Sequence, residues 1–254
     1  MKIEMKPAGS TIKLSKSTRD NEMPGLKFGD CGLSKTPFSM YIVGRPGSGK
    51  SHFLESLIKH NYNVKGKQTC WDRIFYMCPE TSQDSYENSF VNDMDEKDVY
   101  DTLTYDTLSE VYDEAKEVSA EGTAKKPRFS LVCIDDMAVE LKDKAVARLL
   151  LKMLRNYRHI GLSIIICSQN YMALHSQHRQ VIRQLCQFDT GSVLERERLW
   201  VEFASHIPKK EFLTTFWDDF MFSEKYQIMM IDRVKDFDIH KSFKRITISK
   251  YEDE

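Results

Sequence analysis

Long apolar runs are absent from this sequence. No stretch approaches the about 18 residues that a membrane-spanning helix needs, so we expect no membrane partner. The opening residues, MKIEMKPAGSTIKLSKST, have no apolar centre, which argues against a secretion signal there. A charge excess is also missing, because 37 Lys and Arg stand against 38 Asp and Glu. A nucleic-acid partner would therefore need a local basic face, since the overall charge offers no attraction.

Cysteines are few, and their spacing is not that of metal ligands. The six are Cys31, Cys70, Cys78, Cys133, Cys167 and Cys186. Because several lie inside apolar runs, we expect reduced, buried thiols in an intracellular protein. Disulfides or a zinc site are the less favoured alternative. The sequence also shows no internal repeat and no low-complexity tract.

Apolar runs alternate with helical patterns along most of the chain. The 254 residues are 41% apolar and 30% charged, which suits a soluble globular protein of one large domain or two small ones. Strands are expected at residues 38–43, 73–78, 129–134, 162–167, 185–188, 226–231 and 245–249, and helices at 51–60, 108–118, 145–158 and 195–222. Because most of these runs lack period-two alternation, they predict strands covered on both faces. The order predicts an α/β fold with a mainly parallel central sheet between helices.

Two polar segments stand apart from this pattern. Residues 1–36 are rich in Lys, Ser, Gly and Pro and are expected to form an N-terminal arm before a domain over residues 37–254. Residues 80–121 are strongly acidic. We interpret residues 80–127 as a solvated loop and an amphipathic helix within that domain. The alternative is a surface that repels nucleic acid or docks a partner.

The stretch GRPGSGKS, residues 44–51, matches the phosphate-loop pattern G-x-x-x-x-G-K-[ST] and lies between a predicted strand and a predicted helix. Its glycines let backbone N–H groups turn toward phosphate oxygens, and the helix adds the positive end of its dipole. Lys50 would reach the β- and γ-phosphates, and the Ser51 hydroxyl would ligate Mg²⁺. ATP and Mg²⁺ are therefore the expected ligands. Nucleotide contacts are expected from Gly44, Arg45, Pro46, Gly47, Ser48, Gly49, Lys50, Ser51 and His52.

Polar residues end the two apolar runs at 129–134 and 162–167. Asp135 is expected to hold Mg²⁺, and Asp136 to orient or deprotonate the attacking water. Gln169 is expected to sense the γ-phosphate, although a strand-end amide that caps a loop is the plainer interpretation. Asp136 is one methylene shorter than the Glu that most ATPases of this arrangement carry. The attacking water would therefore have to lie closer to the end of the strand.

The long separation between the phosphate loop and the acids is typical of P-loop ATPases with an additional, RecA-like strand between them. Nucleoside kinases usually show a DR pair and an Arg-rich lid, and ABC ATPases show a serine-glycine-glycine signature. This sequence shows neither the combination of such a pair with an Arg-rich lid nor the serine-glycine-glycine signature.

The run RNYRHIGLSIIICSQNYMAL, with VIRQLCQFDTGS after it, is similar to the genome-packaging ATPases of poxviruses and other large DNA viruses, in the FtsK–HerA superfamily. The resemblance covers about residues 38 to 232. It implies an ATPase motor that forms a homo-oligomeric ring, a pentamer or hexamer. Double-stranded DNA and viral capsid proteins are the implied partners. The implied location is the viral assembly site inside the host cell, with the virion as a further one.

The resemblance also implies roles for single residues. Gln169 matches the sensor glutamine of the family, and Arg158 matches an arginine that would act on the neighbouring subunit's γ-phosphate. Arg183 is a second candidate for that arginine. A surface arginine that closes a helix C-terminus is the plain alternative for Arg158.

A basic cluster follows the two acids and is the candidate DNA-binding face. Its members are Lys142, Lys144, Arg148, Lys152 and Arg155. Such a face could hold phosphate backbone without reading sequence, or it could be an ordinary solvated helix surface. Helicase-like or DNA-remodelling activity and a nucleotide-dependent assembly scaffold remain alternative functions. A small-molecule kinase is disfavoured because no lid is found.

Overall fold

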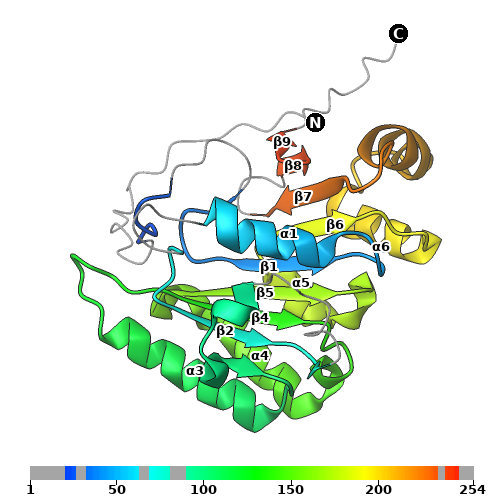
Figure 1. Ribbon diagram of the computed structural model, residues 1–254. Helices are drawn as coiled ribbons and strands as arrows, with labels where there is room; N and C mark the ends of the chain where they lie inside the picture. The colour runs from blue at the N-terminus through cyan, green and yellow to red at the C-terminus, as the bar shows by residue number, and fades with distance from the viewer. Residues whose placement is uncertain (1–20, 27–32, 63–68, 81–89, 234–237, 246–254) are drawn as a thin grey trace, which may run out of the picture.

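A single mixed sheet forms the centre of the molecule (Figure 1). The computed structural model describes residues 21–26, 33–62, 69–80, 90–233 and 238–245. Within these residues the sheet has nine strands in the order β3-β2-β4-β5-β1-β6-β7-β8-β9. The strands are β1 (Ser39–Val43), β2 (Arg73–Met77), β3 (Val99–Tyr100), β4 (Ser130–Asp135), β5 (Leu162–Ser168), β6 (Gln184–Phe188), β7 (Ile228–Asp232), β8 (Asp238–Lys241) and β9 (Lys244–Arg245).

The six strands from β3 to β6 in this order pair in parallel, and β7, β8 and β9 add antiparallel pairs at one edge. The prediction of a mainly parallel α/β sheet is confirmed. β5 lies between β1, which leads into the phosphate loop, and β4, which ends at Asp135. This confirms the additional strand that the sequence spacing predicts.

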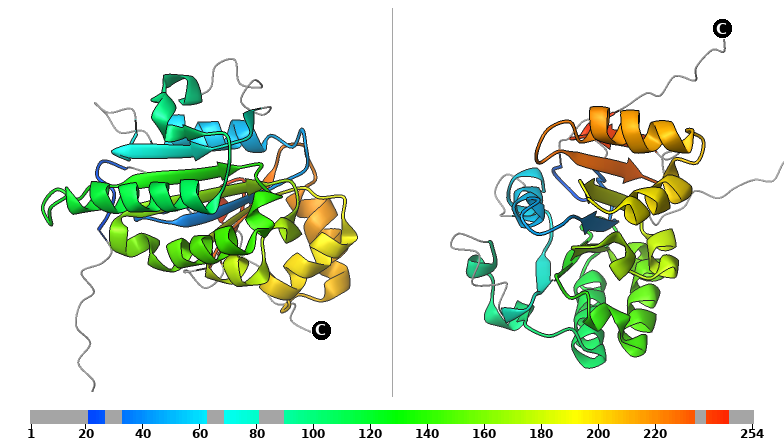
Figure 2. Two further views of the ribbon diagram at one scale, coloured as in Figure 1. Left: turned by 90° about the horizontal axis from the view of Figure 1, so that it is seen from below. Right: turned by 90° about the vertical axis from the view of Figure 1, so that its right-hand side faces the viewer.

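Helices cover both faces of the sheet (Figure 2). α1 and its π-helical continuation η1 lie on one face, and α3, α4, α5, α6 and the π-helix η7 lie on the other. Their bounds are α1 (Lys50–Ser56), η1 (Leu57–Asn61), α3 (Tyr105–Ala120), α4 (Lys144–Asn156), α5 (Ser176–Val181), α6 (Val193–Phe203), α7 (Lys209–Glu211) and η7 (Phe212–Met221). Short 3₁₀ turns are η2 (Phe90–Asp93), η3 (Glu96–Asp98), η4 (Glu140–Lys142), η5 (Tyr157–Ile160) and η6 (Tyr171–Ala173).

Each central strand sends alternate side chains into two separate cores. Tyr41 and Val43 of β1 join the core under α3, α4 and α6, whereas Met40 and Ile42 join the core under α1. Because both faces are covered, every residue of β4 and β5 is buried, which explains why these strands read as continuous apolar runs. The described cysteines, Cys70, Cys78, Cys133, Cys167 and Cys186, are buried free thiols, as expected.

The acidic segment contains the expected helix, α3, but the residues just before it are not a plain loop, because they include η2, η3 and β3, and β3 was not predicted. Residues 81–89 lie outside the described residues, and α3 follows with a capping box in which Thr104 accepts from the Thr107 backbone N–H at 3.2 Å. Of the N-terminal arm, residues 1–20 and 27–32 also lie outside. Met23 and Leu26 are buried in the core under α1, so this part of the arm packs on the domain.

One helix predicted over residues 195–222 is wrong. α6 ends at Phe203, and a new helix starts only after Pro208. Proline lacks an N–H and disfavours helical geometry in the residue before it, so the chain breaks there. Trp200 of α6 donates its Nε1–H to the Ile207 carbonyl at 2.7 Å and so holds the segment between the two helices against α6.

Near the C-terminus the sequence prediction is incomplete. β8 was not predicted. Of the strand predicted at residues 245–249, only Arg245 falls within the described residues, in β9. None of the helices in the described segments is both long and apolar enough to cross a membrane.

Candidate active site

The phosphate loop joins the carboxyl end of β1 to the first turn of α1. The Gly44 N–H donates to the Ser168 carbonyl at 3.1 Å, which ties the loop to the end of β5. A Cβ at Gly44 would lie 2.5 Å from Ser48 Oγ and 2.7 Å from Phe188 Cβ, so only glycine fits there. Gly49 has a φ of 93°, a left-handed geometry that turns the chain into α1.

The polar groups of this loop suit a phosphate ligand. Lys50 extends over the loop and donates from Nζ to the Arg45 carbonyl at 3.3 Å. Ser48 Oγ is buried and has no hydrogen-bond partner within the described part of the chain. A buried hydroxyl without a partner is costly, and a phosphate oxygen would satisfy it. The loop therefore fits the triphosphate that its sequence predicts.

Asp135 lies one strand away from the loop. Its backbone pairs with Cys167 of β5, which pairs in turn with Ile42 of β1. The side chain is 4% exposed and accepts a hydrogen bond at Oδ2 from the Tyr76 hydroxyl at 3.0 Å. A carboxylate in this place, across one strand from Ser51, offers the hard oxygen ligands that Mg²⁺ prefers.

Asp136 and Gln169 meet where β4 and β5 end. Gln169 Nε2 donates to both carboxylate oxygens of Asp136, at 3.0 and 3.1 Å. Asp136 has a φ of 55°, which is uncommon outside glycine and is a geometry often found at functional sites. The structure thus brings together the two side chains for which the sequence predicts roles at the γ-phosphate.

A cavity of about 580 Å³ lies between the phosphate loop and residues 222–227. Its lining includes Arg45, Gly47, Phe188 and Tyr226. Tyr226 is 71% exposed and has a φ of 63°, a strained geometry for an aromatic residue. Its ring lies 3.4 Å from the position of a Cβ on Gly49. An aromatic face is therefore presented next to the loop.

Comparison with known proteins identifies the family. The profile described as Poxvirus A32 protein matches residues 26–234. The chain belongs to this family. The prediction of a poxvirus-type packaging ATPase relative is thus confirmed at the level of family.

Two curated viral proteins resemble this A32 family member. "Uncharacterized protein 015R" of Frog virus 3 (isolate Goorha) is 26% identical over 217 residues, covering 84% of this chain and 61% of that protein. "DNA packaging protein OPG160" of Variola virus is 26% identical over 157 residues, covering 62% of this chain and 55% of that protein. The chain therefore spans little more than half the length of these relatives.

Among solved structures, the genome packaging NTPase B204 from Sulfolobus turreted icosahedral virus 2, in complex with ATP-gammaS, has the same fold. The TM-score is 0.52 at 19% identity, with 81% of this chain and 96% of that chain covered. This likeness confirms the P-loop ATPase fold of the A32 family member.

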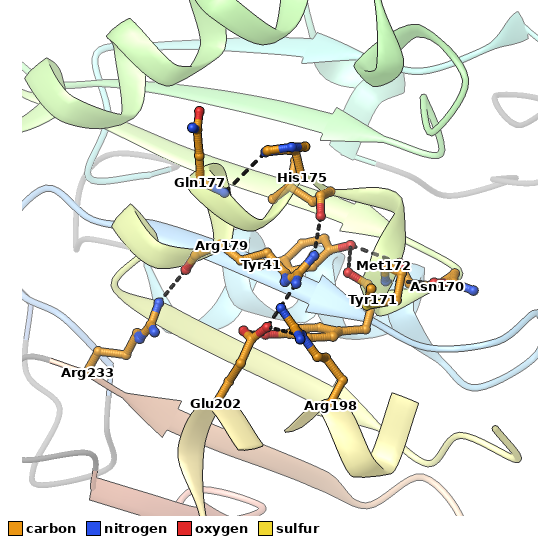
Figure 3. A network of polar contacts seen from close by, with 11 residues as sticks. Tyr41, Asn170, Tyr171, Met172, His175, Gln177, Arg179, Arg198, Glu202 and Arg233 are labelled. Carbon is orange, nitrogen blue, oxygen red and sulfur yellow. Dashed lines mark hydrogen bonds and ion pairs between the residues drawn. The ribbon is translucent and has the colours of Figure 1, made fainter. Parts of the chain in front are cut away.

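A polar network that is buried at Tyr41, Tyr171 and Arg179 and reaches the surface at Arg198 connects the loop that follows β5 to its neighbours (Figure 3). The Tyr41 hydroxyl lies 2.6 Å from Ser168 Oγ and donates to the Asn170 carbonyl at 2.9 Å. Further along the loop, the Tyr171 hydroxyl donates to Glu202 of α6 at 2.5 Å. Glu202 also accepts from Arg179 at 2.9 Å and from Arg198 at 2.7 Å. The loop that carries Gln169 is therefore anchored to β1 and to α6.

Arg158 lies at the amino-terminal end of β5, in η5, whereas Gln169 follows the carboxyl end of the same strand. The seven residues of β5 separate it from Gln169 by about 20 Å, at about 3.3 Å per residue. Arg158 therefore cannot reach a phosphate bound in its own subunit. It lines a cavity of about 290 Å³ with Arg128 and His159.

Arg183, the second candidate, lies at the same end of the sheet and makes an ion pair with the buried Asp232 at 3.4 Å. Its Nη1 also donates to Thr36 Oγ1 at 3.3 Å. These contacts give Arg183 a structural role.

The basic face predicted on α4 is present. All five side chains are exposed, namely Lys142, Lys144, Arg148, Lys152 and Arg155. On α4 itself, Lys144, Arg148, Lys152 and Arg155 follow spacings of three and four residues, so they form one stripe on the helix. The acidic α3 packs beside α4 and borders this stripe.

Several residues at the site were not found by sequence reasoning. Tyr76 and Tyr41 are buried strand residues, and their apolar context hid their hydroxyl contacts. Asp189 makes ion pairs with Arg45 at 3.7 Å and Arg196 at 3.6 Å, linking the phosphate loop to α6. Its place at the end of the strand predicted over residues 185–188 was the one available signal.

Proposed function

We propose that this chain is an ATPase motor that moves double-stranded DNA into a viral capsid. The observation that carries the proposal is the gathering of the phosphate loop, Asp135, Asp136 and Gln169 at one edge of the sheet. Membership of the A32 family supports it, as do the name of the Variola virus relative and the packaging role of the structural neighbour. The ATP-gammaS complex of that neighbour supports ATP as the nucleotide.

The triphosphate would bind across the loop, held by backbone N–H groups and Lys50. Ser51 and Asp135 would hold Mg²⁺, which supplies positive charge to the β- and γ-phosphate oxygens. Asp136 would orient the attacking water and accept its proton. Gln169, in contact with Asp136, would also touch the γ-phosphate and so distinguish ATP from ADP.

The nucleobase would lie in the cavity beside the loop. Tyr226 and Phe188 offer aromatic surface there, and the ion-paired Arg45 and Asp189 also line it. Stacking on a tyrosine ring is favourable for any base, by about 1–3 kcal/mol in nucleic-acid complexes. The nucleotide contacts expected from Arg45, Pro46 and His52 are also part of this proposal.

The exposed stripe on α4 would contact the phosphate backbone of the DNA. Arg158 would act on the nucleotide of a neighbouring subunit, because its own nucleotide is out of reach. That requires a head-to-tail ring, for which a pentamer or hexamer is the size that the family resemblance implies. Capsid proteins are the proposed docking partners, and the infected host cell, with the virion as a second place, is the proposed location.

ATPase assays with different DNAs test the function. The motor is expected to hydrolyse ATP faster with blunt duplex DNA, and to need no fork or single-stranded end. Lys50→Ala should abolish the activity. Stimulation by forked DNA alone would indicate a helicase instead. ATP binding without turnover, with or without DNA, would indicate an assembly scaffold.

A further inference from the structure

Two buried tyrosines make the same contact on opposite faces of the sheet. Tyr76 of β2 is in register with Cys133 of β4, and its hydroxyl reaches two residues further, to Asp135. Tyr41 of β1 is in register with Ile166 of β5, and its hydroxyl reaches two residues further, to Ser168. Each hydroxyl therefore lies at the end of the neighbouring strand, next to a residue of the candidate site.

Packing fixes the position of both rings. Tyr76 is 1% exposed and meets Phe90 edge-on, with ring centroids 5.4 Å apart. Tyr41 is also 1% exposed and lies beside Tyr171, with centroids 6.0 Å apart. Burial raises the pKa of Tyr41 above its ordinary value, so its hydroxyl keeps its proton and remains a donor. A rigid donor can hold a strand end in one orientation.

We propose that Tyr76 is a positioning residue for the metal-binding carboxylate and that Tyr41 is the matching positioning residue for the sensor loop. The Tyr76 hydroxyl holds Oδ2 of Asp135 and so sets the direction in which Oδ1 points. Tyr41 holds Ser168 and the Asn170 carbonyl, the two residues that flank Gln169. The inference rests on the proposed nucleotide site and assigns to it two buried residues that act through Asp135 and through the residues beside Gln169.

Loss of each hydroxyl should affect a different property of the site. Outer hydrogen bonds to a metal ligand typically change metal affinity by 10–100-fold when they are lost. Tyr76→Phe should therefore weaken nucleotide binding in the presence of Mg²⁺ while leaving binding in EDTA unchanged. Tyr41→Phe should lower kcat while leaving nucleotide affinity unchanged under both conditions. The two variants remove the same atom from equally buried rings, so each is the control for the other.

The experiment measures the Kd of a fluorescent ATP-gammaS analogue with Mg²⁺ and with EDTA, together with kcat, for both variants. We expect the Mg²⁺-dependent gain in affinity to fall by about tenfold or more in Tyr76→Phe alone. An unchanged gain, or an equal loss of affinity in EDTA, would overturn the role of Tyr76. Unchanged kcat in Tyr41→Phe would overturn the role of Tyr41.

A double-mutant cycle separates positioning from a general loss of structure. In an Asp135→Asn background, Tyr76→Phe should have no further effect on the Mg²⁺ dependence, because the carboxylate through which it acts is gone. A further, additive loss would show that Tyr76 supports the fold instead. If the wild-type chain bound no nucleotide at all, the proposed function would fail before this test is reached.

Discussion

Gln169 holds both carboxylate oxygens of Asp136, at 3.0 and 3.1 Å. The contact joins the end of β5 to the end of β4, and the Gly44 N–H bond to Ser168 joins β5 to the phosphate loop on its other side. β5 is therefore the element through which the loop and the two acids contact one another. A change at the γ-phosphate that moves Gln169 would change the environment of Asp136 directly.

Asp136→Asn should bind ATP normally and lose turnover. The substitution keeps the shape of the side chain and one of its two hydrogen bonds from Gln169, but removes its capacity to accept a proton, which general-base catalysis requires. We expect kcat to fall by about 100-fold or more. Nucleotide affinity and steady-state hydrolysis measured on the same preparation check this. Normal turnover would remove Asp136 from the mechanism and leave it as a partner of Gln169.

Gly44→Ala should impair the loop through packing alone. The added methyl would lie 2.7 Å from Phe188 Cβ, and overpacking of this kind costs about 1–3 kcal/mol. The expected result is a lower melting temperature and weaker nucleotide binding. Gly191→Ala is the matched control, because no heavy atom of the described residues outside its chain neighbours lies within 4 Å of its Cβ position. Equal effects of the two substitutions would contradict the packing argument.

Glu202 should contribute to stability in a pH-dependent way. Burial by itself would raise its pKa, but hydrogen bonds from Arg179 and Tyr171 outweigh burial and hold the pKa below its ordinary value of 4.5. The unfolded chain therefore takes up the proton first as the pH falls. The stabilisation is complete above about pH 4.5 and is lost as the pH drops through the lower, folded-state pKa.

Glu202→Gln tests this dependence. It should lower the free energy of unfolding at pH 7 by about 1–3 kcal/mol, because the buried Arg179 loses its charged partner. The difference from wild type should shrink below pH 4.5. Glu197→Gln is the control, since Glu197 is a half-buried residue of the same helix that pairs with the exposed Lys209 at 2.9 Å. Urea unfolding at several pH values measures both, and a pH-independent difference would contradict the assignment.

The residues that the sequence could identify are those whose role depends on local order. The phosphate loop needs glycines, a lysine and a serine at fixed spacing. Asp135 is the last residue of a buried strand, and Asp136 and Gln169 each follow directly after one. Their meeting at one edge follows from the parallel sheet, in which all such strands end on the same side.

The sequence could not identify residues whose roles depend on which strands are neighbours in the sheet. Tyr76 reaches Asp135 only because β2 lies next to β4, and no pattern along the chain specifies that order. Tyr226 belongs to a segment more than 170 residues beyond the phosphate loop that it faces. The break at Pro208 is different, because that residue could have been read as a helix terminator from the sequence.

The α4 stripe should set the salt dependence of DNA binding. Each phosphate contact contributes a slope of about −0.9 to a plot of log K against log salt. Arg148→Gln with Lys152→Gln should therefore reduce the steepness of that plot by about two units and weaken binding to all sequences equally. Lys116→Gln on the neighbouring α3 is the control, because Lys116 pairs with Asp113 at 2.7 Å. An unchanged slope in the double variant would place the DNA elsewhere.

Arg158 should act only between subunits. Arg158→Ala keeps an intact nucleotide site and should lose about 10³-fold or more in ATPase rate, whereas Lys50→Ala keeps the arginine and loses the nucleotide. In a 1:1 mixture of the two variants, half the subunits carry an intact phosphate loop, and half of those have a neighbour that still carries Arg158. Random assembly into a head-to-tail ring would therefore restore about a quarter of the sites. Arg183→Ala should instead lower the melting temperature, because it leaves the buried Asp232 without its guanidinium. ATPase rates of the single and mixed proteins, with ring assembly checked by light scattering, distinguish these outcomes. Intact rings without recovery in the mixture would mean that Arg158 does not act in trans.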